Sequence, residues 1–170
     1  FAENALRAHG LRKRFVFHPG MGHLPTDVSP DVRSRSYMIE AEVTIPPDGA
    51  EGVLLAHGDA TCGYSLYLQG GRLHHTLNVG GALVTVSSEA AVPPGHRLLG
   101  VRCRQTPDGR IFTLAIDGRA VGEVNTHLGF ANFISWSGLD VGRDRASPVA
   151  GYAAPFEFTG KLRRVIVTMD

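Results

Sequence analysis

Apolar and polar residues alternate with a period of two along most of the chain after residue 35. From Tyr37 to Ile45 every odd position is apolar or aromatic, and most even positions carry Glu or Thr. This period is typical of a β-strand with one buried face and one wet face. Comparable short runs predict further strands over residues 52–57, 64–69, 73–79, 83–88, 98–105, 110–117, 120–124, 138–142 and 158–169.

Turn residues separate these runs. Gly70-Gly71 and Gly80-Gly81 suit tight hairpins, because the backbone of such turns needs positive φ. Pro107-Asp108-Gly109 and Asp117-Gly118 mark two more turns, whereas residues 128–136 and 143–155 look irregular. About ten to twelve short strands joined by turns predict an all-β fold, a two-sheet antiparallel β-sandwich.

The first residues differ in pattern from the rest. Residues 1–14 are expected to be a connector from an upstream domain, with a turn or two of helix that ends at Gly10. Residues 15–170 then form the sandwich domain, and its first part, up to residue 34, is expected to be mostly loop. Because the sequence begins with Phe1, we expect a fragment or a processed product.

Charge and composition exclude several classes of partner. The formal net charge is only +1, which argues against nucleic acid and anionic membranes as partners. The chain has no apolar run of the ~18 residues that a transmembrane helix needs. Two cysteines are too few for a disulfide scaffold, so a cytoplasmic location is expected, although an export signal already removed would leave the same sequence.

Several stretches, in this order and spacing, resemble the C-terminal region of long bacterial arylsulfatases of the mycobacterial type. The stretches are Phe17–Met21, Leu24-Pro25, Arg35-Ser36, Ala50–Gly58, Gly63–Tyr67 with Leu73, Gly138–Asp144, Ser147–Val149 and Pro155–Gly160. The resemblance runs from about residue 15 to residue 167. It implies a concanavalin A-like, laminin G-like jelly roll attached after a sulfatase catalytic domain.

The same resemblance implies that the chemistry lies elsewhere. Sulfatases convert a Cys or Ser within Cys/Ser-x-Pro-x-Arg to formylglycine, beside a divalent metal. Here Gly63-Tyr64 follows Cys62 and Arg104-Gln105 follows Cys103, so neither cysteine fits the motif. We therefore expect no catalytic residue and no cofactor in this chain, and an upstream catalytic domain as its main partner. A second copy of the chain and a carbohydrate are the other candidate partners.

Aromatic and loop residues supply the candidate binding site. Tyr67 alternates against Leu66 and Leu68, so its ring should point outward, and Trp136 lies in an irregular segment. Flat rings of this kind can stack on the apolar face of a sugar, although most aromatic residues belong to cores. Arg143 completes the candidate set, with pairing to a carboxylate as its alternative role.

Acidic residues allow two further hypotheses. Asp140 and Asp144 bracket a short loop and could hold Ca²⁺, or could instead accept hydrogen bonds from loop amides. Glu40 and Glu42 share one face of a strand about 7 Å apart, a spacing that glycosidases use, but solvent-facing charges are the simpler interpretation.

The remaining candidate ligands are expected to be structural. His74 and His75 point to opposite sides of a strand and cannot chelate one ion together. Cys62 and Cys103 are expected to be free thiols, with a disulfide left open.

Three functions follow from these observations. The first is a non-catalytic accessory domain of an arylsulfatase, for which a broad exposed apolar patch would be the sign. The alternative is a stand-alone carbohydrate-binding lectin-like module, which needs exposed aromatic rings. A small glycoside hydrolase, which needs two close carboxyls in a cleft, is the third.

Overall fold

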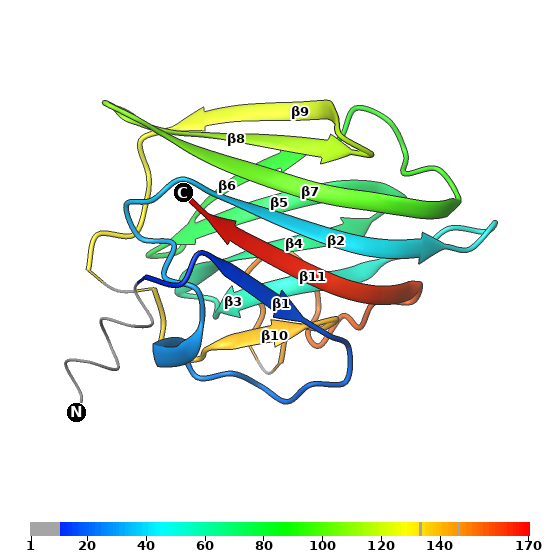
Figure 1. Ribbon diagram of the computed structural model, residues 1–170, viewed down its shortest axis with the longest axis horizontal. Coiled ribbons are helices and arrows are strands. Elements are labelled where there is room, and N and C mark those ends of the chain that lie inside the picture. Colours follow the sequence, from blue (N-terminus) through cyan, green and yellow to red (C-terminus); the bar gives the residue numbers. More distant parts are fainter. Residues whose placement is uncertain (1–10, 133, 146) are drawn as a thin grey trace.

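Two antiparallel β-sheets face each other in the computed structural model, which describes residues 11–132, 134–145 and 147–170 (Figure 1). The six-stranded sheet has the order β1-β11-β2-β7-β8-β9 and the five-stranded sheet the order β10-β3-β4-β5-β6. The predicted all-β sandwich is confirmed. The strands are β1 Arg14–Phe17, β2 Tyr37–Ile45, β3 Gly52–Gly58, β4 Cys62–Gln69, β5 Arg72–Val79, β6 Ala82–Ser87, β7 Gly95–Thr106, β8 Gly109–Ile116, β9 Arg119–Thr126, β10 Leu139–Val141 and β11 Lys161–Met169, and one 3₁₀ helix spans Thr26–Val28.

Strand positions agree closely with the alternation in the sequence. β2 has the predicted bounds, and its odd residues are buried while its even residues are half-buried. β1 is the main addition: it begins at Arg14, inside the expected connector, and pairs with β11. The short helix expected before Gly10 lies outside the described residues.

The core fills the space between the two sheets. Ile39 and Ala41 of β2, Leu66 of β4 and Phe112 of β8 are fully buried there. Complete burial of one such large apolar side chain stabilises a fold by roughly 1.5–3 kcal/mol relative to exposure. Alternation therefore fixes which face of each strand turns inward, since a slip by one residue would expose every one of these side chains.

The segment after β1 closes one open edge of the sandwich. Leu24 forms a β-bridge with Leu139, so residues 18–31 run beside the edge strand β10 (Figure 1). Phe15 and Phe17 are only 2% and 5% exposed and belong to the core. The N-terminal aromatic residues thus leave no exposed patch of the kind that an accessory domain would use for docking.

The two outer faces differ. Residues 147–158, most of which belong to the loop predicted over residues 143–155, fold over β3 and β4, where Val149, Ala150 and Tyr152 pack on Val53 and Tyr67. Over the described residues, no such layer covers the outer face of the six-stranded sheet, where Glu40, Arg102 and other polar side chains alternate with the core residues. No helix in the described part of the chain has the length and apolar character to cross a membrane.

Candidate functional site

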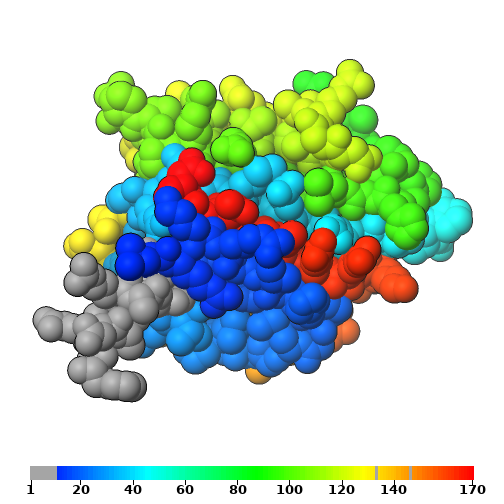
Figure 2. Space-filling model, viewed as in Figure 1, coloured from blue at the N-terminus to red at the C-terminus, as the bar shows by residue number. Residues whose placement is uncertain are grey.

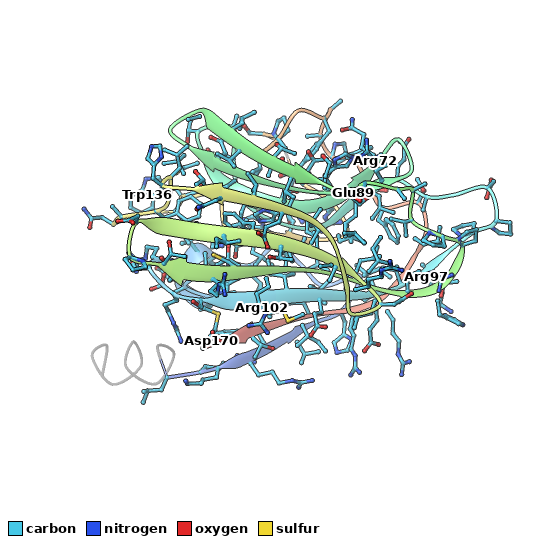
Figure 3. All side chains as sticks on the ribbon, turned by 90° about the horizontal axis from the view of Figure 1, so that it is seen from above. Arg72, Glu89, Arg97, Arg102, Trp136 and Asp170 are labelled. Atoms are coloured by element: carbon cyan, nitrogen blue, oxygen red, sulfur yellow. The ribbon has the colours of Figure 1, made fainter. Side chains whose placement is uncertain are left out.

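Trp136 lies at one end of the sandwich with its side chain in solvent. Its exposed fraction is 89%, the largest among the exposed apolar residues of the described chain, and it is the single tryptophan of the sequence. Figure 3 shows it at the far end of the molecule from Arg97. Trp136, a candidate sugar-stacking residue from the sequence, keeps that role as a prediction.

The loop that carries Trp136 is fixed on both sides of the ring. Ser135 and Ser137 both donate hydrogen bonds to Oδ2 of Asp59, at 2.5 and 2.8 Å. The hydroxyl of Thr26 donates to the carbonyl of Ser135 at 2.6 Å, and Ile134 anchors the loop in the core. An aromatic side chain on a loop held in this way loses little conformational entropy on binding a ligand.

Asp59 organises this end of the molecule. It also accepts hydrogen bonds from the amide and hydroxyl of Thr61, within the β3–β4 turn. Burial alone would raise the pKa of the Asp59 carboxyl, but the hydrogen bonds from Ser135, Thr61 and Ser137 hold this pKa well below its usual value. The carboxylate therefore keeps its negative charge well below neutral pH. Sequence patterns gave no sign of this role, because its partners lie 76 and 78 residues away.

Tyr67 does not share the exposure of Trp136. It faces away from the core as predicted, but the covering loop leaves it only 5% exposed. Its ring stacks on His74, meets Tyr152 edge-on, and its hydroxyl lies 3.0 Å from that of Thr76. This corrects the expectation of an exposed ring, since the sequence did not show that residues 147–158 fold over this strand.

Asp140 and Asp144 are both buried and are engaged within the protein. Oδ2 of Asp144 accepts hydrogen bonds from the amide of Val149 at 2.8 Å and from the hydroxyl of Tyr152 at 2.5 Å. Burial raises the pKa of the Asp144 carboxyl, although these two donors act in the opposite direction. Among the described residues no group of three or more His, Cys, Asp or Glu side chains could hold a metal ion. These contacts match the loop-amide interpretation of the two aspartates.

Basic side chains surround Asp140. Nδ1 of His23 lies 3.0 Å from its Oδ1, and the guanidinium groups of Arg145 and Arg143 lie 3.7 and 4.0 Å from the same oxygen. The amide of Arg145 donates to Oδ2. Arg143 thus lies beside a carboxylate, which is the alternative role that the sequence suggested. Its role in binding a ligand stays a prediction.

Glu40 and Glu42 lie on the open face of the six-stranded sheet. Oε1 of Glu42 accepts hydrogen bonds from Nε and Nη2 of Arg164, at 3.0 and 2.8 Å. The Arg164 hydrogen bonds hold the pKa of Glu42 below its usual value, whereas a glycosidase acid must hold its proton at neutral pH. The geometry therefore favours the solvent-facing interpretation of this pair.

A shallow groove on this open face, at the end of the sandwich away from Trp136, was not predicted. It has a volume of about 660 Å³ and is formed by the end of β2 and the starts of β7 and β11. Its lining residues are Glu42, Val43, Thr44, His96, Arg97, Leu98, Lys161 and Arg163. Most of its charged residues are basic, although the chain as a whole is close to neutral.

The histidines and cysteines have structural positions. Nδ1 of His57 lies 3.2 Å from the hydroxyl of Tyr64, and its Nε2 lies 3.2 Å from that of Thr26. His75 points into the core against Phe112, opposite in direction to His74, as the strand pattern predicted. Burial lowers the pKa of His57 to about 4 and that of His75 to about 3. Cys62 and Cys103 are both free, with Cys103 buried.

Comparisons with known proteins identify the fold and no family. No family model and no curated protein match the chain. The CBM40 domain of the Ruminococcus gnavus IT-sialidase, bound to α2,3-sialyllactose, is similar with a TM-score of 0.61 and 14% identity, over 81% of this chain and 77% of that one. Domains LG4-5 of mouse laminin alpha1 are similar with a TM-score of 0.57 and 18% identity, over 93% of this chain and 39% of that one.

A third structure, the leech intramolecular trans-sialidase, gives a TM-score of 0.61 and 10% identity over 92% of this chain and 25% of that one. Identities this low show the fold alone. The chain has the concanavalin A-like jelly-roll sandwich fold, which confirms the fold that the sequence resemblance implied. The link to an arylsulfatase gains no support from these comparisons.

Proposed function

We propose that this chain is a non-catalytic carbohydrate-binding module, with Trp136 as the platform on which a sugar ring stacks. The observation that carries the proposal is a large aromatic side chain, 89% exposed, on a loop that Asp59 fixes through both neighbouring serines. A flat aromatic ring on a loop held in this way can stack on the apolar face of a sugar with little loss of conformational entropy.

Support also comes from the fold, as an analogy. The CBM40 domain with the same fold was solved with α2,3- and α2,6-sialyllactose bound. A shared fold does not by itself carry over a function, so the argument here rests on the Trp136 loop. The accessory role on a sulfatase has weaker support, because the exposed large apolar side chains of the described chain are Leu11, Val28, Leu83 and Trp136, and Phe15 and Phe17 are buried.

The experiment uses Trp136 as its own reporter. As the single tryptophan and almost fully exposed, it should emit as a solvated indole and be quenched readily by iodide. An oligosaccharide that binds should shift the emission to shorter wavelength and reduce quenching. A glycan array identifies the oligosaccharide, and titration calorimetry then measures its affinity.

Substitution locates the site. Trp136→Ala should weaken binding at least tenfold, which is about 1.4 kcal/mol, while the melting temperature stays the same because the side chain is exposed. Leu83→Ala is the matched control, since Leu83 is also an exposed apolar residue, at 52%, on β6. Equal affinity of Trp136→Ala and wild type for the same glycan would refute the proposed platform.

A further inference from the structure

We infer that the groove at the start of β11 binds a carboxylate or sulfate group carried by an acidic polysaccharide. Three neighbouring strands form it, and their residues stand in one row: Lys161 of β11 pairs with Thr44 of β2, and Thr44 pairs with His96 of β7. In Figure 2 the orange-red start of β11, the cyan end of β2 and the green start of β7 meet on the right of the face shown.

A β-bulge gives this groove more positive charge than regular alternation would. Leu162 pairs with Val43 and Arg164 pairs with Glu42, so Arg163 is an extra residue without a partner in the ladder. The burial pattern of β11 confirms that Arg163 and Arg164 both face outward, between the buried Leu162 and Val165. A bulge re-aims side chains in this way, and here it sets two guanidinium groups side by side.

The negative charges nearby do not occupy all the cations. Glu42 takes both of its close hydrogen bonds from Arg164, and Arg163 lies 3.7 Å from it with 78% of its side chain exposed. Arg97 is bound by Asp117 and by the carbonyls of residues 93 and 94. Lys161 has no ion-pair partner among the residues that the structure describes. Lys161 is therefore available to an external anion, and the exposed Arg163, whose ion pair with Glu42 is long at 3.7 Å, can bind the same anion.

The floor of the groove adds the features that a sugar ring needs. Leu98 is half-buried and offers an apolar surface, and Thr44 and His96 form a polar pair with 2.9 Å between Oγ1 and Nδ1. A neutral or apolar floor beneath two cations fits an acidic sugar better than a polynucleotide. A nucleic acid presents a phosphate every few ångströms and needs a long cationic stripe, which a chain of net charge +1 does not supply.

This site is separate from the tryptophan platform. Arg97, which lines the groove, and Trp136 lie at opposite ends of the sandwich (Figure 3). Only the carbohydrate nature of the ligand rests on the proposed function, because the anion-binding geometry stands without it. Binding in the groove should leave the fluorescence of Trp136 unchanged, so the two proposals can fail independently.

The test uses three hexasaccharide probes on the whole chain at low salt: a heparin-derived one with sulfates, an oligogalacturonate with carboxylates, and neutral maltohexaose. We expect at least one acidic probe to bind and maltohexaose to leave the groove empty. The variant Lys161→Ala/Arg163→Ala should reduce that affinity at least tenfold. The difference between the sulfated and the carboxylated probe then distinguishes the two anionic groups.

A charge-matched control separates a site from diffuse attraction. Arg102→Ala/Arg104→Ala removes the same two charges from the same face, with Arg102 six residues or about 20 Å further along β7 than His96. This control should change affinity less than twofold, and both double variants should keep the wild-type melting temperature. Equal losses in the two variants, or tighter binding of a single-stranded DNA of the same charge than of either acidic hexasaccharide, would overturn the inference.

Discussion

The two outer faces of this sandwich arise from the same alternation and end in opposite environments. On β4 and β5 the outward residues Tyr67 and Thr76 are buried beneath residues 147–158, and their hydroxyl oxygens lie 3.0 Å apart. On β2 and β7 the outward residues Glu40 and Arg102 remain in contact with water. A period of two therefore states which side chains leave the core, but not whether they reach solvent.

Hydrogen bonds between buried groups stabilise the covered face, whereas the polar contacts on the open face are exposed and contribute less to stability. Asp144, Tyr152 and Ser65 form one connected set, with the Tyr152 hydroxyl 2.5 Å from Asp144 Oδ2 and 2.9 Å from Ser65 Oγ. Buried polar groups are costly when a partner is removed, whereas exposed ion pairs such as Glu42 with Arg164 contribute little. Mutations on the covered face should therefore mainly lower stability, and mutations on the open face should mainly change ligand binding.

The largest effect is expected on the covered face, from Asp144→Ala. This change leaves the buried amide of Val149 without its acceptor and leaves the hydroxyl of Tyr152 with Ser65 Oγ alone, at a cost of about 2–3 kcal/mol. Urea unfolding at pH 7 measures it. Glu40→Ala, an equal loss of one carboxylate on the open face, is the control and should cost less than about 0.5 kcal/mol.

Asp144→Asn distinguishes the charge from the hydrogen bonds. Because burial raises the pKa of Asp144 in the folded state, its contribution to stability is present at low pH and is lost as the pH rises through that raised pKa. At pH 7 the buried carboxylate is thus a cost, and Asn keeps an acceptor without it. We expect Asn to be far milder than Ala; a similar large loss in both would show that the charge itself is required.

The sequence predicts the fold far better than it predicts the sites. The strand at Tyr37–Ile45 follows from local alternation alone. Trp136 is identifiable as a candidate because it lies between strands. Its fixation by Asp59 is not, since that contact spans more than 70 residues.

Two other features depend on pairing that no local pattern contains. Predicting the burial of Tyr67 requires the position of residues 147–158 on the sheet, and predicting the cationic groove requires the register of three strands. The bulge at Arg163 is visible only once Leu162 and Arg164 are matched to neighbouring residues of β2. Short-range periodicity thus fixes the direction of side chains, and long-range pairing decides which of them meet.

A second, intermediate effect distinguishes the interiors of the two sheets, because both buried imidazoles belong to the five-stranded one. The pKa of His75 is lowered to about 3 and that of His57 to about 4 by burial, so both contribute stability above pH 6.5 that is lost as the pH falls toward those values. As the pH falls from 7 to 5, each of these two histidines should lower the free energy of unfolding by about 2 kcal/mol.

His75→Leu tests this assignment. Neither ring nitrogen of His75 has a hydrogen-bond partner in the described chain, so Leu should keep or increase stability at pH 7. It should also remove about 2 kcal/mol from the loss between pH 7 and pH 5, as followed by urea unfolding at several pH values. Parallel stability curves for the variant and wild type would show that His75 takes up its proton in the folded state.

The smallest effect on stability, and the one that links the open face to its ligand, is expected from Glu42→Gln. Arg164 holds the pKa of Glu42 below its usual value, so the pair contributes above that range and is lost as the pH falls through it. An exposed pair of this kind is worth about 0.2–1 kcal/mol, so unfolding in urea should show a loss within that range, and Glu40→Gln should show less.

The same change, Glu42→Gln, frees Arg164 and raises the net charge of the groove by one, next to Arg163 and Lys161. Affinity for an acidic hexasaccharide should then rise about threefold or more in calorimetry at low salt, and the gain should shrink as salt screens it. Glu40 is opposite Gly100 and Ile166 in the neighbouring strands, and neither residue carries a charge. Glu40→Gln should therefore leave that affinity nearly unchanged. Equal gains from the two substitutions would mean that the whole face attracts anions, and that the open face, unlike the covered one, has no organised site.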